Sequence, residues 1–123
     1  MLKFIPKMLH DLKKIPQVKA VILYGSYAKG TQKPISDVDI CVLTEKHIDE
    51  MTGKDARGWS GPKIDIVLFW DLPVNIRYAV LREGKVILVR DEDFLNEVTV
   101  ETMSEYLDFR HIIDRSIARM VEA

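Results

Sequence analysis

The chain has 123 residues, a hydrophobic fraction of 47%, a charged fraction of 30% and a formal net charge of -1. These values are typical of one globular domain, so we expect residues 1–123 to form a single domain and exclude a disordered or fibrous protein. The near-neutral charge also argues against a surface that binds long nucleic acid nonspecifically.

The start of the chain shows no sign of an export signal. In MLKFIPKMLHDLKK, lysines and a proline interrupt the apolar residues, and no small-residue cleavage site follows. No stretch approaches the roughly 20 apolar residues that a membrane-spanning helix needs. Cys41 is the only cysteine, which excludes an internal disulfide, and its apolar neighbours indicate simple packing. We therefore expect a cytoplasmic protein without a membrane partner.

The first half of the chain predicts one helix and two strands. Leu2, Ile5, Leu9 and Leu12 recur at helical spacing, so a helix is expected over about residues 1–15, with Pro16 at its end. The remaining elements share short lengths and clear boundaries. They are an apolar strand over 18–24, a helical turn over 26–30, a polar loop over 31–36 and a strand over 37–43.

The second half predicts two more strands and three helices. The expected elements are a helix over 45–51, an exposed glycine-rich loop over 53–62, a strand over 63–70, a helix over 71–82, a strand over 86–89 and a long helix over 91–120. In the third strand, Asp65 alternates with apolar residues and shares a face with Val67 and Phe69. The predicted fold class is α+β, an α/β layered arrangement with a mixed sheet of about four strands flanked by helices.

A glycine-serine turn follows the first strand. Gly25 allows a sharp turn and a close approach of a ligand, and the helical turn after it directs N–H groups toward the same point. Ser26 adds a hydroxyl, and Lys29 supplies a positive charge within reach of phosphate oxygens. The same residues also suit a turn with no ligand, so by themselves they do not identify a phosphate site.

Two aspartates then lie on one face of the second strand. Asp37 and Asp39 are two residues apart, so both side chains project to the same side. Like charges at one place are unfavourable without a cation, and hard oxygen ligands suit Mg2+. A solvent-facing strand end is the alternative for this pair taken alone.

Asp65 is a charged residue inside an otherwise apolar strand. If the third strand lies beside the second, Asp65 reaches the same site as Asp37 and Asp39. Three carboxylates can hold two divalent ions that assist an in-line displacement at phosphorus. Asp65 then becomes either a proton acceptor or only a metal ligand, and the sequence leaves both roles open.

The spacing of these residues carries a resemblance. Gly25-Ser26, ten intervening residues, Asp37-Val38-Asp39 and the later Asp65 resemble the signature of the DNA polymerase β-like nucleotidyltransferase superfamily. The short length and the YLDF segment at 106–109 resemble its minimal antitoxin-type branch, which is encoded beside HEPN-domain proteins. The similarity runs from the first strand through the third and, more loosely, to the last helix.

The resemblance implies a function and a set of roles. It implies that Gly25 and Ser26 contact the triphosphate, with Lys29 as a basic residue nearby, and that Asp37, Asp39 and Asp65 hold the metal ions. It further implies transfer of AMP from ATP to a tyrosine of a partner HEPN toxin, which silences that toxin. The protein would then be a Mg2+-dependent adenylyltransferase and an antitoxin.

Other interpretations remain at this stage. The acceptor of the nucleotide could be a small molecule or an RNA end, although the chain is short for either. A non-catalytic module that covers the toxin is a second alternative. A P-loop is excluded, because Thr31 stands where its lysine belongs, and no Rossmann fingerprint is present.

Some further residues and the last helix also invite interpretation. Trp59 and Arg57 are expected to be exposed loop residues rather than a nucleotide clamp, and His47 is expected on a solvated helix face. The predicted last helix is about 45 Å long, more than a small domain can cover. We therefore expect its far half to contact either a partner or a second copy of the chain. In the second case the chain forms a homo-oligomer.

Overall fold

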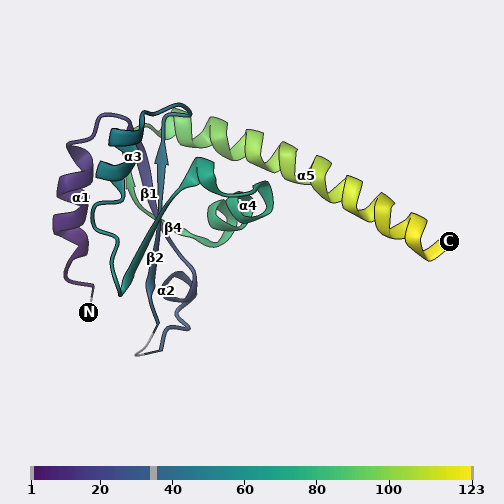
Figure 1. Cartoon of the computed structure of the whole chain (residues 1–123), viewed down its shortest axis with the longest axis horizontal. Helices are drawn as coiled ribbons and strands as arrows, with labels where there is room; N and C mark the ends of the chain where they lie inside the picture. The colour runs from purple at the N-terminus through teal and green to yellow at the C-terminus, as the bar shows by residue number, and fades with distance from the viewer. Residues whose placement is uncertain (1, 34–35, 123) are drawn as a thin grey trace.

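The computed structural model of the chain describes residues 2–33 and 36–122 (Figure 1). These residues form helices, strands and one 3-10 turn that alternate along the chain. In order, the elements are α1 (Ile5–Lys13), β1 (Val18–Tyr24), α2 (Ser26–Lys29), β2 (Val38–Thr44), α3 (Glu50–Ala56), β3 (Ile64–Leu68), the 3-10 turn η1 (Phe69–Asp71), α4 (Val74–Glu83), β4 (Lys85–Val89) and α5 (Glu92–Glu122).

The strands form one mixed sheet in the order β3-β2-β1-β4. β1 pairs antiparallel with both β2 and β4, whereas β2 and β3 are parallel. The predicted mixed sheet of four strands and the α+β class are thereby confirmed. β3 and β4 are the edges of the sheet, and the start of β2 lies beside the start of β3 at one end.

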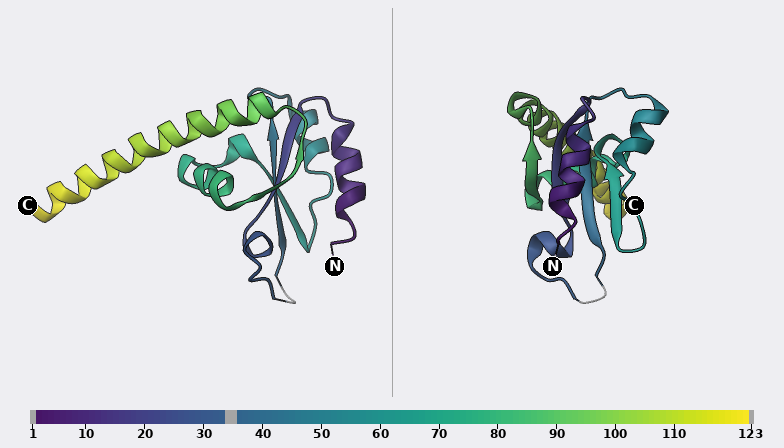
Figure 2. Two further views of the ribbon diagram at one scale, coloured as in Figure 1. Left: turned by 180° about the vertical axis from the view of Figure 1, so that it is seen from behind. Right: turned by 90° about the vertical axis from the view of Figure 1, so that its left-hand side faces the viewer.

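Helices cover both faces of the sheet (Figures 1 and 2). On one face, Met8 and Leu12 of α1 and Ala56 of α3 are buried against alternate strand residues. On the other face, Val80 of α4 and Val98 of α5 are buried with the opposite set of strand residues. This division follows from the period of two along each strand. It also means that Asp39 and Asp65, at odd positions, belong to the α4 and α5 face.

The third helix differs from the prediction. A helix was expected over 45–51 and a loop over 53–62, but α3 runs over Glu50–Ala56. The cause is the cap at Asp49, whose Oδ1 accepts a hydrogen bond of 2.8 Å from the backbone N–H of Thr52. A carboxylate at this position satisfies a free N–H group and so fixes the first turn. Gly53, expected in an exposed loop, is buried within this helix.

Trp59 was expected to be exposed and is half-buried instead. Its indole Nε1 donates a hydrogen bond of 3.0 Å to Asp11 Oδ2, and its ring stacks on Phe4 at a centroid distance of 6.4 Å. The ring therefore closes the seam between α1 and the segment after α3. The prediction failed because the partners of Trp59 are 48 residues away in the chain.

Several predicted boundaries shift by a few residues. The first helix begins at Ile5 with Pro6 in its first turn, and it buries Met8 in addition to Leu12. The third strand ends at Leu68, because η1 turns the chain toward α4. Within the predicted loop over 31–36, residues 34 and 35 lie outside the described residues.

The last helix is anchored at its start and projects at its end, as Figures 1 and 2 show. Asp91 Oδ1 accepts a hydrogen bond of 3.0 Å from Phe94 N, which caps the first turn. Tyr106 contacts α4, where its ring stacks on Tyr78 with centroids 3.9 Å apart. Every residue from Leu107 to Val121 is exposed. Among the described helices, α5 included, none combines the length and apolar character needed to cross a membrane.

Candidate active site

The turn after β1 is packed directly on an aspartate. Gly25 has φ 73° and ψ -151°, a conformation that residues with a Cβ rarely adopt. A Cβ at this position would clash with Oδ2 of Asp39. Glycine is thus required twice, for the backbone angle and for the close approach of the carboxylate. The turn and the second strand therefore form one site rather than two neighbouring features.

The helical turn predicted over 26–30 is α2, a single turn that begins at Ser26. Ser26 is half-buried, and its carbonyl oxygen accepts a hydrogen bond of 2.9 Å from Thr31 N. Gly30 ends the turn in the left-handed conformation with φ 72°. The hydroxyl of Ser26 is held close to the point where β1 ends.

Lys29 is engaged with α4. Its Nζ lies 3.2 Å from Oε2 of Glu83, and 56% of the Lys29 side chain is exposed. A cavity of about 220 Å³ lies beside this pair, lined by Gly25 and Lys29 on one side and by Ile76 and Glu83 of α4 on the other. The ammonium group thus lies at the rim of a cavity that opens next to the turn.

The second and third aspartates are neighbours across two parallel strands. Asp39 and Asp65 are partners in the β2–β3 register, and Tyr24 is the partner of Asp39 on β1. Asp39 is half-buried, whereas Asp65 is exposed on the edge strand. The condition set by the sequence, that β3 must lie beside β2, is therefore met.

The electrostatics of this sheet end are negative. Burial raises the pKa of Asp39, and the charges of Asp65 and Asp37 raise it further. Burial also raises the pKa of Tyr24 to about 12, with Asp39 as the next cause. In both groups burial is the largest cause, and the nearby carboxylates add to it because like charges repel. A cation bound here would remove that repulsion.

Asp37 precedes β2 and is exposed. It lies two residues before Asp39, on the same side of the chain, and its charge acts on Asp39. In the described part of the chain, no three His, Cys, Asp or Glu side chains converge into a ready-made metal cluster. The available donors are carboxylate oxygens in mutual repulsion, a set that fits Mg2+ with further ligands from water or phosphate.

The residues that the sequence analysis did not assign to the site lie away from it. Arg57 ends α3, and its Nη1 lies 3.7 Å from Asp71 Oδ2. His47 is exposed in the segment after β2, at the opposite end of that strand from Asp39, and not on a helix as expected. Cys41 is buried, and burial raises the pKa of its thiol to about 12, in agreement with the packing role expected for it.

The sequence analysis did not identify two residues of the site. Tyr24 lies beside Asp39 in the register, and its position at the end of an apolar strand directly before Gly25 was the available signal. Glu83 lies 54 residues after its partner Lys29, and no local pattern marks it. The ion pair between them follows only from the packing of α4 next to the turn.

Known proteins resemble the chain in both sequence and structure. A family model described as "Polymerase beta, Nucleotidyltransferase" matches residues 7–93. The protein adenylyltransferase MntA of Shewanella oneidensis is 43% identical over 109 residues, which cover 81% of this chain and 73% of that protein. A crystal structure described as a toxin-antitoxin with AMP-PNP covers 98% of both chains at 26% identity and a TM-score of 0.70.

A second relative matches over a shorter segment. MJ1547 of Methanocaldococcus jannaschii is 38% identical over 71 residues, or 58% of this chain and 56% of that protein. The match thus spans little more than half the length of that relative. The matched family segment of residues 7–93 contains the turn and all three aspartates, and it ends where α5 begins.

Proposed function

Because this chain belongs to the polymerase β-type nucleotidyltransferase family, we propose that it transfers AMP from ATP to a tyrosine hydroxyl of a HEPN-domain toxin and so acts as an antitoxin. The observation that carries the proposal is the packing of the Gly25 turn on Asp39, which in turn is the register partner of Asp65. This arrangement joins a triphosphate-binding turn to a cation-binding set of carboxylates.

The nucleotide is assigned to the β1 side of the site. Ser26 and the backbone of the turn bind the phosphates, and Lys29 reaches them from the rim of the neighbouring cavity. Lys29 would exchange its exposed contact with Glu83 for a phosphate oxygen. Exposed ion pairs contribute only about 0–1 kcal/mol, so this exchange costs little.

The acceptor is assigned to the β3 side. β3 is an edge strand and Asp65 is exposed there, so an incoming hydroxyl can approach from that edge. Asp37, Asp39 and Asp65 would hold two Mg2+ ions, whose charge neutralises the triphosphate and the leaving pyrophosphate. The nucleotide and the acceptor then occupy opposite sides of Asp39.

The transfer is a displacement at the α-phosphorus of ATP. The tyrosine oxygen forms a bond to that phosphorus, and the bond from phosphorus to the oxygen that bridges to the β-phosphate breaks. Pyrophosphate leaves with the electron pair, and Asp65 accepts the phenolic proton. The product is a tyrosine that carries AMP.

Two relatives support the acceptor and the antitoxin role. The S. oneidensis relative is named a protein adenylyltransferase, and the structural neighbour is described as a toxin-antitoxin with AMP-PNP. A HEPN-domain toxin is the partner that we assign.

The test is a labelling reaction. The full chain is incubated with ATP labelled at the α-phosphate, Mg2+ and a HEPN-domain protein encoded beside it. We expect label on a tyrosine of the HEPN protein, and we expect Asp37→Asn and Asp39→Asn to abolish it. Asp55→Asn, an exposed carboxylate on α3, is the matched control and should leave labelling unchanged.

The outcomes separate enzyme from binding module. Full labelling by Asp39→Asn would reject the mechanism. Protection of cells from the toxin by a variant in which Asp37, Asp39 and Asp65 are all asparagine would show that binding alone neutralises the toxin. Label that appears on RNA or on a small molecule instead would reject the protein acceptor.

A further inference from the structure

The projecting part of α5, residues Leu107 to Val121, exposes an apolar surface that none of residues 2–33 and 36–122 covers; we call it the free half of α5. Its large apolar side chains are 40–81% exposed, and several of them share one side of the helix. They are Leu107, Phe109, Ile112, Ile113, Ile117, Met120 and Val121. Contiguous apolar surfaces of this kind are rare on a protein that functions without a partner.

The apolar residues nearest the centre of this side follow a symmetric pattern. Phe109 and Ile117 lie four residues before and after Ile113, and Tyr106 and Met120 lie seven residues before and after it. Spacings of four and seven return to nearly the same face of an α-helix. We call these five residues the central stripe. The spacing of their positions is the same in both chain directions from Ile113.

We infer that a second copy of this chain covers the central stripe, with the two free halves antiparallel and Ile113 at the two-fold axis. In this register Ile113 meets its own counterpart. Phe109 faces Ile117 of the second copy, and Met120 lies at the level of Tyr106, whose ring is partly covered by Tyr78 of its own chain. Every position of the stripe then meets an apolar position, as the self-complementary interface of a two-fold dimer requires.

The position of α4 selects the antiparallel direction. Tyr78 of α4 stacks on Tyr106, so α4 occupies the stripe side of α5 up to that residue. In a parallel pair the two α4 helices would meet at the same level and collide. In the antiparallel pair each α4 meets only the last turn of the other helix, and the two bodies stand at opposite ends.

The charges beside the stripe are also compatible with a second copy. Arg110 and Asp114 flank one edge of the stripe, one helical turn apart. In the antiparallel register, Arg110 of one copy lies within two residues, about 3 Å along the axis, of the position opposite Asp114 of the other. Two symmetric Arg110–Asp114 pairs can therefore form. In a parallel pair this edge would instead face the opposite edge of the second copy, so these pairs would not form.

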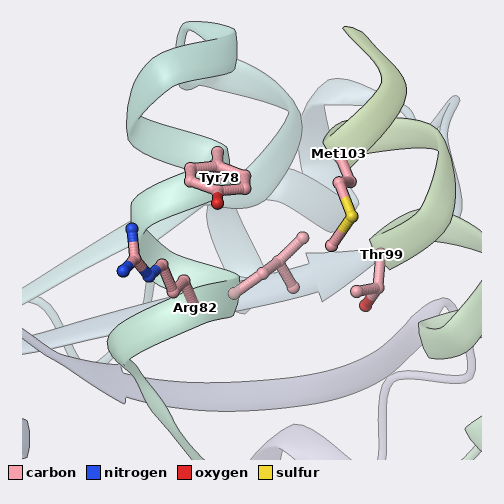
Figure 3. A pocket seen from close by; sticks show the side chains of 5 residues that line it. Tyr78, Arg82, Thr99 and Met103 are labelled. Atoms are coloured by element: carbon pink, nitrogen blue, oxygen red, sulfur yellow. The ribbon is translucent and has the colours of Figure 1, made fainter. Parts of the chain in front are cut away.

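A pocket between α4 and α5 receives the end of the second helix. It measures about 210 Å³ and is lined by Tyr78, Leu81 and Arg82 from α4 and by Thr99 and Met103 from α5 (Figure 3). Met103 lies three residues before Tyr106, which lies at the level of Met120 of the second copy. The last turn of that copy thus ends beside the pocket, where its Met120 side chain finds an apolar recess.

The first test measures the mass of the purified chain in solution over a series of concentrations. We expect a shift from the mass of one chain to twice that mass. Ile113→Asp places two charges on the axis and should keep the protein monomeric. Ala118→Asp adds the same charge on the opposite side of the free half and should still dimerise; equal behaviour of the two variants would overturn the proposal.

The second test reads the register by disulfide cross-linking. Cys41 is buried and does not interfere. Ile113→Cys should cross-link with itself, and Phe109→Cys should cross-link with Ile117→Cys when the two are mixed, but neither of these two alone. Cross-links of Phe109→Cys with itself would indicate a parallel pair and overturn the register.

Two further outcomes decide the occupant. A wild-type chain that stays monomeric at every concentration overturns the proposal. If cysteines placed in the stripe are then protected from a thiol reagent only after a HEPN-domain protein is added, the stripe is a binding surface for that protein and not for a second copy. Both results are independent of nucleotide transfer, which Ile113→Asp leaves intact because Ile113 is remote from the three aspartates.

Discussion

The carboxylate end of the sheet and the free half of α5 place their side chains by opposite means. At the sheet end, Asp39 is fixed between Tyr24 and Asp65 by the pairing of three strands, and Gly25 touches it from the turn. In the free half, the side chains depend only on the hydrogen bonds of their own helix. One region is positioned by tertiary structure and the other by local structure.

This difference teaches how the two tasks are divided. Chemistry at phosphorus requires groups held in fixed geometry, which adjacent strands supply. Recognition of another helix requires a continuous apolar face, which a long helix supplies without further support. We therefore expect substitutions at the sheet end to affect activity strongly, and loss of the free half to affect the fold weakly.

The largest effect is expected for Asp39→Asn. Loss of this ligand removes several kcal/mol of charge stabilisation from the transition state, which lowers the rate by roughly a thousandfold. Stability should stay the same or rise, because the amide keeps the shape of Asp39 and ends its repulsion with Asp65 and Asp37. Labelling rates and urea unfolding in a chelator measure the two effects, and a large loss of stability would contradict this account.

The next effect is expected for Gly25→Ala. Its backbone conformation is nearly restricted to glycine and costs other residues about 1–3 kcal/mol, and the added Cβ also clashes with Asp39. We expect more than about 3 kcal/mol of destabilisation by urea unfolding, with loss of nucleotide transfer. Gly30→Ala is the control: φ is also positive but nothing lies within 4 Å of the Cβ. It should cost only about 1–2 kcal/mol, and equal costs for both would show that contact with Asp39 is unimportant.

A smaller effect is expected for Trp59→Phe. The phenylalanine can keep the stack on Phe4 but loses the hydrogen bond to Asp11. Loss of one such bond to a carboxylate costs about 1.5–3 kcal/mol, with the lower end expected here because Asp11 is accessible to water. Asp11→Asn should cost less, because its oxygen still accepts the bond. Nucleotide transfer should be unchanged under conditions where the variant is fully folded, because Trp59 packs against α1 and away from the three aspartates. A loss of activity in the folded variant would instead support a role for Trp59 as a nucleotide contact.

Much of the fold follows from local patterns in the sequence. The strands were predictable because apolar residues alternate with Asp65 in one case and fill short runs bounded by glycine or proline in others. The start of α3 was not, because the Asp49 cap outweighs the weaker helical pattern over 45–51. Trp59 was misplaced because its environment is built by α1, far away in the chain.

The site was predictable only in part. A spacing of two residues brings Asp37 and Asp39 to one side of β2 in any sheet, so their proximity required no further information. The neighbourhood of Asp39 and Asp65 depends on the order of the strands, which the residues alone do not determine. The pair of Lys29 with Glu83 depends on how α4 packs beside α2, and it has no local signature.

The smallest effect is expected for removal of the free half of α5. Residues 107–121 contribute no buried side chain, so a chain that ends at Tyr106 should unfold within about 1 kcal/mol of the full chain, measured in urea at a concentration where the full chain is monomeric. Val98→Ala in the buried half is the contrasting change and should cost about 2 kcal/mol, because Val98 is 3% exposed. A truncated chain that loses more than this would mean that the projecting turns stabilise the body through the helix itself. In that event the two halves of α5 form one cooperative unit. The boundary between the body of the protein and the region that recognises a partner would then lie at Asp91, before α5, and not at Tyr106 within it.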